Sequence, residues 1–216
     1  MKFKLWFTVL AASISLLSGT AATASPLTTY QISIDTTALN GGFFQLDFQL
    51  NDGSATGDGN SMVTLTNFNF GGGAASGAPL LSVGASGDTI NGASLSDVTF
   101  LNEILQDFIA GNTLSFTLGL ALNDDPGTPD LFTLAIIDGT GFEIPTGGPL
   151  GSEIVSFQYG DNAPQAFASS GPFAIPLPTV TAVPGPNAVP EPSALLLILA
   201  GLAALGASRR LSGRPH

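Results

Sequence analysis

The sequence predicts an all-β fold, a β-sandwich of jelly-roll-like type, and three observations lead to this prediction. Apolar and polar residues alternate with a period of two in several runs, which is the pattern of strands that bury one face. Clusters of Gly, Asn, Asp and Pro separate these runs, as turns do. Fifteen Phe and a single Trp among 216 residues suit the core between two facing sheets.

The predicted strands follow one another along a domain that we expect to cover residues 25–175. Alternation predicts strands at residues 30–34, 44–50, 63–70, 114–122, 132–136 and 155–159, with a short one at 142–144. Within the third run the apolar phase shifts by one residue. A β-bulge near Thr66 and Asn67 would explain this shift.

Two stretches of this domain do not follow the simple alternation. Between Val98 and Gly111 the apolar residues recur at helical spacing, which predicts a strand that leads into a short helix or an irregular edge. The apolar residues concerned are Leu101, Ile104, Leu105, Phe108 and Ile109. Residues 71–87 are rich in Gly, Ala and Ser, and we expect a long surface loop there.

The N-terminus has the pattern of a secretory signal peptide. Lys2 and Lys4 provide the positive start, and the apolar run Leu5–Leu17 follows. Ala22 and Ala24 are the small residues that signal peptidase requires before its cleavage point. We therefore expect residues 1–24 to form a signal helix that signal peptidase removes after Ala24.

The C-terminus contains a Pro-rich linker at 176–188 and then a segment at 189–212 with an apolar run from Ala194 to Ala207. As a helix, that run would span about 21 Å, which makes a short transmembrane helix against a hydrocarbon core of about 30 Å. Basic residues after it belong on the cytoplasmic side. The residues that mark this segment are Val189, Pro190, Glu191, Pro192, Arg209 and Arg210.

This order of parts resembles the PEP-CTERM sorting signal of Gram-negative bacteria, a tail that is also called the ice-binding protein C-terminal domain. The resemblance covers residues 188–210 and rests on the Pro190-Glu191-Pro192 triplet, the apolar helix and the Arg pair. It implies recognition by an exosortase, cleavage near the triplet, and transfer from a membrane-anchored precursor to the cell surface or extracellular matrix. It also implies a producer that makes exopolysaccharide and biofilm.

The charge of the predicted domain excludes several functions. All five basic residues lie near the termini, and no Lys, Arg, His or Cys occurs between residues 25 and 190, where fifteen of the sixteen acids lie. Such a surface argues against nucleic-acid binding, which requires basic side chains for the phosphates. Catalysis by Ser-His-Asp or Ser-Lys groups and metal sites built on His or Cys are excluded as well.

Oxygen ligands for calcium are plentiful in two loops, at residues 51–60 and 123–130. Acids, amides and glycines are concentrated there, and such loops can wrap a cation that requires six to eight oxygens, although neither loop matches the EF-hand pattern. The same residue types are common in turns that bind nothing, so both interpretations stay open. The candidate calcium ligands are Asp52, Asp58, Asp124, Asp125 and Asp130.

The leading functional interpretation is a non-enzymatic, exosortase-sorted surface or matrix protein associated with extracellular polysaccharide. One alternative is a calcium-dependent carbohydrate-binding module, and another is a structural spacer without a ligand. A third is a glycoside hydrolase that uses carboxylates alone, with Glu103, Glu143 and Glu153 as candidates.

Overall fold

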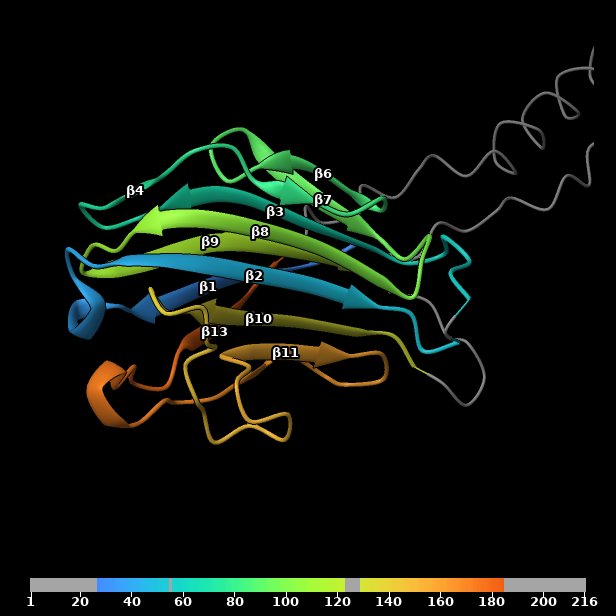
Figure 1. The fold of residues 1–216 in the computed structure, drawn as a ribbon. Coiled ribbons are helices and arrows are strands. Elements are labelled where there is room, and N and C mark those ends of the chain that lie inside the picture. Colours follow the sequence, from blue (N-terminus) through green and yellow to red (C-terminus); the bar gives the residue numbers. More distant parts are fainter. Residues whose placement is uncertain (1–26, 55, 123–128, 185–216) are drawn as a thin grey trace, which may run out of the picture.

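A computed structural model describes residues 27–54, 56–122 and 129–184, and these form two antiparallel sheets that face each other (Figure 1). This arrangement confirms the all-β sandwich. Within the described ranges, no helix is long and apolar enough to cross a membrane. The predicted signal peptide and the 189–212 segment, with Ala22, Ala24, Val189, Glu191 and the Arg pair, lie outside the described residues.

The first sheet has six strands in the order β13-β1-β9-β3-β7-β6. Its long central pairs are antiparallel, with Ile32 opposite Phe116 and Leu65 opposite Leu118. The strands are β1 (Thr28–Asp35), β3 (Met62–Asn69), β6 (Ala85–Asp88), β7 (Gly92–Ser96), β9 (Thr113–Ala121) and β13 (Thr179–Val183).

The second sheet has the order β12-β11-β10-β2-β8-β4, and β5 pairs with β8 beside this path. Short 3-10 helices at Thr37–Leu39 and Gly171–Phe173 lie in the connections. The strands are β2 (Phe43–Asn51), β4 (Ala74–Ala75), β5 (Leu80–Leu81), β8 (Leu101–Ile109), β10 (Leu131–Ile137), β11 (Val155–Gln158) and β12 (Gln165–Ala166).

The core lies between the sheets and is built from alternate residues of each strand. Phe48 of β2 and Phe116 of β9 meet edge to face with ring centroids 5.7 Å apart, and both side chains are fully buried. Phe68 stacks on Phe116 at 5.2 Å. Such aromatic pairs add to the free energy of burying the rings. The Phe-rich composition therefore serves the contact between the two sheets, as expected.

The helical spacing after Val98 was misleading, because residues 101–109 form one continuous strand, β8. This strand pairs with β2 along its whole length, from Phe43 opposite Ile109 to Asn51 opposite Leu101. Its inward side chains are Asn102, Ile104, Gln106 and Phe108. Two of these four are polar, which hid the period of two in the sequence.

The predicted β-bulge is confirmed, whereas the predicted loop at 71–87 and strand at 142–144 need correction. The register of β3 against β9 shifts between Thr66 and Asn69, and Asn67 has a φ of 55°, which confirms the bulge. The expected loop at 71–87 contains the short strands β4, β5 and the start of β6. The expected strand at 142–144 is reduced to a single bridge between Glu143 and Ile137.

The sandwich extends beyond the predicted boundary at residue 175. Within the expected linker at 176–188, Thr179–Val183 form β13, which pairs with β1 at the edge of the six-stranded sheet. Pro residues on both sides concealed this strand, because a Pro-rich stretch is typical of an extended linker. An edge strand tolerates flanking Pro residues, since one side of its backbone needs no partner.

We expect Phe48→Ala to lower the free energy of unfolding by about 3–5 kcal/mol, because it removes a fully buried ring between the sheets. Phe43→Ala on the same strand is the matched control, since that ring is 53% exposed and its loss should cost less than about 1 kcal/mol. Urea unfolding of both variants measures the difference. Equal losses would contradict the packing described here.

Candidate metal centre and outer-face hollow

Three carboxylates extend the inward-facing rows of the core beyond the ends of their strands. Asp52 is the next inward position after the last inward residue of β2, and Asp97 follows the inward row of β7 in the same way. Asp130 stands directly before β10, at the inward position that precedes Phe132. All three residues are fully buried. The apolar core therefore ends in a polar layer.

The strand register brings these positions to the same end of the sandwich. The end of β2 at Asn51 is opposite Leu131 at the start of β10, and the end of β7 at Ser96 is opposite Met62 at the start of β3. Asp52 and Asp130 adjoin β2 and β10 of the seven-stranded sheet, whereas Asp97 adjoins β7 of the six-stranded sheet. The cluster therefore spans the gap between the two sheets.

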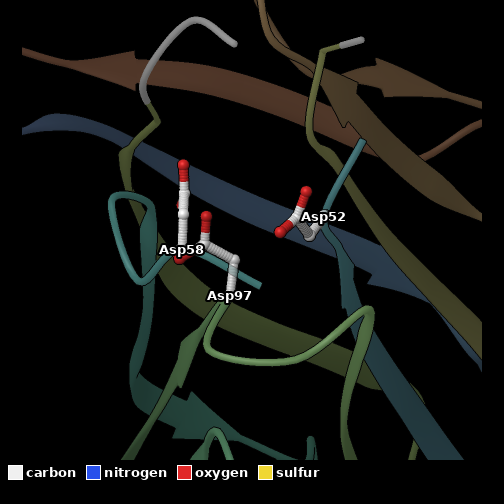
Figure 2. A group of neighbouring side chains, drawn as sticks. All are labelled: Asp52, Asp58 and Asp97. Atoms are coloured by element: carbon white, nitrogen blue, oxygen red, sulfur yellow. The ribbon is translucent and has the colours of Figure 1, made fainter. Parts of the chain in front are cut away.

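Asp58 completes the group from the loop that connects β2 to β3. Carboxylate oxygens of Asp52, Asp58 and Asp97 lie within 4.8 Å of one another, and Figure 2 shows the three side chains gathered at this end. Asp58 is exposed while the other two are buried. The group is therefore reachable from solvent on one side and enclosed by protein on the other.

Backbone N–H groups hold the carboxylates of the β2–β3 loop in place. Asp52 accepts hydrogen bonds from Ser54 N at 2.5 Å and from Gly57 N at 2.6 Å. Asp130 joins this loop to β10, because it accepts from Gly53 N at 3.0 Å and from Ser61 Oγ at 2.5 Å. The loop is thus folded around the acids of its own sequence and of β10.

Asp97 differs from Asp52 and Asp130 because only one of its two carboxylate oxygens accepts a hydrogen bond. Its Oδ1 accepts a hydrogen bond from Ser61 N at 3.0 Å, whereas the buried Oδ2 has no hydrogen-bond partner in the described part of the chain. Burial raises the pKa of Asp97 to about 6, and the nearby charges of Asp130 and Asp58 raise it further. In native proteins a buried polar atom without a partner needs an explanation, and a bound ion or water is one of the accepted explanations.

The predicted calcium ligands are partly brought together. Asp52, Asp58 and Asp130 meet at this end, whereas Asp124 and Asp125 lie outside the described residues. The sequence analysis missed Asp97. The signal was present, since Ala93 and Leu95 alternate inward and Asp97 takes the next inward position.

No residue in the described part of the chain offers the cluster a cationic side chain, because the sequence has none between residues 25 and 190. Hydrogen bonds, protonation or a bound cation must therefore offset the charge. Carboxylates with a hydroxyl nearby are the donors that hard divalent cations prefer. Two oxygens on opposite sides of a calcium ion would be about 4.6–5.2 Å apart, so carboxylate oxygens with these separations can share one ion.

A second feature is a hollow on the outer face of the seven-stranded sheet, near the opposite end of β10. The segment at 138–154 folds back toward this face and leaves a hollow of about 550 Å³ that is lined by Ile137, Phe142, Glu143 and Leu150, among others. The Phe142 ring is 73% exposed. A neighbouring hollow of about 220 Å³ adds Gln49 and Thr133.

The carboxylates of this face have different roles. Asp47 is 3% exposed. Its Oδ2 accepts from Gln49 Nε2 at 2.8 Å, and its buried Oδ1 has no partner in the described part of the chain. Burial raises the pKa of Asp47 to about 7, and the charges of Glu103 and Glu143 contribute. Glu153 accepts backbone hydrogen bonds at 2.8 and 3.1 Å, which fix its own loop.

Comparison with known protein families matches residues 188–210 to the PEP-CTERM protein-sorting motif. The chain carries a PEP-CTERM sorting motif. This motif indicates an exported precursor that an exosortase processes at the membrane and sorts to the cell surface. Searches of curated proteins and of solved structures find no match. The motif therefore accounts for the export of the chain, while the activity of the sandwich must be argued from its own residues.

We expect the metal-free protein to lose stability as pH rises from about 4 to about 7. Burial raises the pKa of Asp47 from 3.8, the value of a solvent-exposed carboxyl in the unfolded chain, to about 7 in the fold, so the folded state is favoured while this group keeps its proton. Ionisation of Asp47 would cost roughly 2–4 kcal/mol, and Asp47→Asn should remove this part of the slope. Urea unfolding between pH 4 and 8 in the presence of a chelator measures it.

Asp88→Asn is the control for this experiment. Backbone N–H groups of Asn91 and Ile90 lower the pKa of exposed Asp88, so its contribution to stability is lost only as pH falls below about 4. The slope between pH 5 and 8 should therefore stay unchanged in Asp88→Asn. An unchanged slope in Asp47→Asn would refute the assignment of the pH dependence to Asp47.

Proposed function

We propose that the chain is a non-enzymatic surface or extracellular-matrix protein whose sandwich binds exopolysaccharide at the hollow beside Phe142. The observation that carries the proposal is an exposed aromatic ring in a hollow that also contains the Glu143 carboxylate. Sugars offer an apolar ring face and many hydroxyls, and such a combination of groups suits both. The sorting motif supports the proposal, because it takes the precursor to the cell surface.

The position of the hollow also favours this proposal. The described chain begins and ends at the end of the sandwich that holds the carboxylate cluster. Thr28 at the start of β1 is opposite Leu120, and Leu120 is opposite Val63 near the start of β3. Val183 at the end of β13 is opposite Thr29. Ile137, which lines the hollow, is opposite Gln45 at the other end of the seven-stranded sheet. A precursor held at its C-terminus would therefore present the hollow on the far end of the sandwich.

The same residues argue for a non-enzymatic role. Glycoside hydrolysis requires a proton donor and a second carboxylate on either side of a substrate cleft. On this face the carboxyl with the raised pKa is Asp47, which is buried beneath the surface. Glu153 is occupied with its own loop. Both side chains are buried, so neither is exposed to pair with Glu143 across a sugar bound in the hollow.

We expect Phe142→Ala to weaken binding of the protein to the producer's purified exopolysaccharide about tenfold, because it removes the stacking surface. Phe100→Ala is the matched control, since Phe100 is 56% exposed but lies before β8 at the opposite end of the sandwich. Co-sedimentation with the polysaccharide measures both affinities. Equal affinity of Phe142→Ala and the unmodified protein would rule out this hollow.

A calcium-dependent carbohydrate-binding module is the second candidate, and the carboxylate cluster is the observation that favours it. In that case the sugar would bind at the cluster and the cation would coordinate its hydroxyls. Binding would then disappear in a chelator and would be insensitive to Phe142→Ala. The leading proposal expects binding to persist in a chelator and to weaken in Phe142→Ala.

Processing by an exosortase gives a further expectation. Cleavage near Pro190-Glu191-Pro192 would remove Arg209 and Arg210, and signal peptidase would leave a chain that begins near Ser25. Intact mass of the protein isolated from the producer's surface measures both ends. A surface form that retains the Arg pair would contradict removal of the tail.

A further inference from the structure

The strongest unexplained feature of the sandwich is the buried Oδ2 of Asp97. A carboxylate oxygen without a partner inside a protein costs free energy, because nothing replaces the water that it loses on folding. Here two more carboxylates, Asp52 and Asp58, have oxygens within 4.8 Å of the Asp97 carboxylate. Three like charges at such distances repel each other, so the fold holds an arrangement that is unfavourable without a counter-charge.

We propose that Asp52, Asp58 and Asp97 bind one calcium ion that fastens the two sheets together at this end of the sandwich. Asp52 follows β2 of the seven-stranded sheet and Asp97 follows β7 of the six-stranded sheet, while Asp58 lies on the connection between the sheets. The ion would satisfy Asp97 Oδ2 directly. Asp130 positions the site, because it holds Gly53 N and Ser61 Oγ.

Calcium fits these residues better than other common cations. The ligands are all oxygens, which excludes cations that prefer nitrogen or sulfur. Calcium accepts irregular coordination from flexible loops, whereas magnesium demands near-octahedral geometry and retains its waters. The β2–β3 loop, with positive φ angles at Gly57 and Gly59, can wrap such an ion. Extracellular calcium modules typically bind with dissociation constants of about 0.1–1 mM.

This inference does not rest on exopolysaccharide binding, since the ion would be structural and lies at the opposite end from Phe142. Its consequence is that the exported protein reaches full stability only where calcium is abundant. Because the ion joins strands that are far apart in the sequence, its loss would loosen the end at which the described chain begins and ends.

The test compares thermal unfolding of the full chain in non-ionic detergent at pH 7.5 with 10 mM CaCl₂, 10 mM MgCl₂, 30 mM NaCl or a chelator. For the unmodified protein we expect calcium to raise Tm by roughly 5–10 °C over the chelator and NaCl samples. Equilibrium dialysis with ⁴⁵Ca should give one ion per chain. No calcium shift, or an equal shift with magnesium, would overturn the proposal.

Asp97→Asn separates ion binding from a simple hydrogen-bonding role. Its amide oxygen can still accept from Ser61 N, but the charge is gone, so the calcium shift should fall below about 2 °C. In the chelator this variant should unfold at a temperature equal to or above that of the unmodified protein, because a repelled charge has been removed. Lower stability in both conditions, or an undiminished calcium shift, would refute the site.

Asp88→Asn serves as the matched control for the charge change. Asp88 lies in the β6–β7 turn, where it accepts hydrogen bonds from Ile90 N and Asn91 N, and it is not part of the cluster. The calcium shift of Asp88→Asn should equal that of the unmodified protein. Loss of the shift in this variant as well would mean that calcium acts by general screening, and the proposal would fail.

Discussion

The absence of any positive side chain within the sandwich is the constraint on which its other properties depend. Fifteen carboxylates occur between residues 25 and 190 without a single Lys, Arg or His. No acid can be stabilised by an ion pair within that region, so each must be solvated, hydrogen-bonded to the backbone, protonated or bound to a cation. The described acids illustrate these solutions.

Exposed acids use the backbone. Asp88 accepts N–H groups of its own turn, and these bonds lower its pKa. Asp138 accepts from the Thr140 hydroxyl and from N–H groups of its turn, which lowers its pKa as well. Buried acids cannot all do so. Asp47 and Asp97 each have one oxygen without a partner and a raised pKa. Asp47 stands below the outer face as a single buried group, whereas Asp97 has two other carboxylates beside it. Because of this contrast, we assign Asp47 to stabilisation by protonation, and we propose that a shared cation stabilises Asp97.

The strands were predictable where every inward residue is apolar, as in β9 and β2. Prediction failed at β8, because Asn102 and Gln106 occupy inward positions and are fully buried there. Asn102 is satisfied by Leu50 O and Thr99 O, contacts that exist only in the folded chain. Strand β13 was missed for a related reason, since its partner β1 lies about 150 residues earlier. Pairing across such a separation leaves no local pattern.

The carboxylate cluster was likewise predictable only in part. Loop composition identified Asp52, Asp58 and Asp130, because acids and glycines are concentrated around them. Asp97 comes from a different strand, and only the register of β7 on β3 brings it to the group. The hollow beside Phe142 likewise depends on how the segment at 138–154 folds back over β10. The position of Asp97 in the cluster and the hollow beside Phe142 therefore depend on contacts between distant segments, which residue type alone does not reveal.

A crystal structure of the protein grown in millimolar calcium tests the central claim most directly. It should show one calcium ion between the sheets, with carboxylate oxygens of Asp52, Asp58 and Asp97 at about 2.3–2.6 Å from the metal. Anomalous scattering would identify the ion. A site that contains only water, with Asp97 Oδ2 hydrogen-bonded as a protonated acid, would contradict the account.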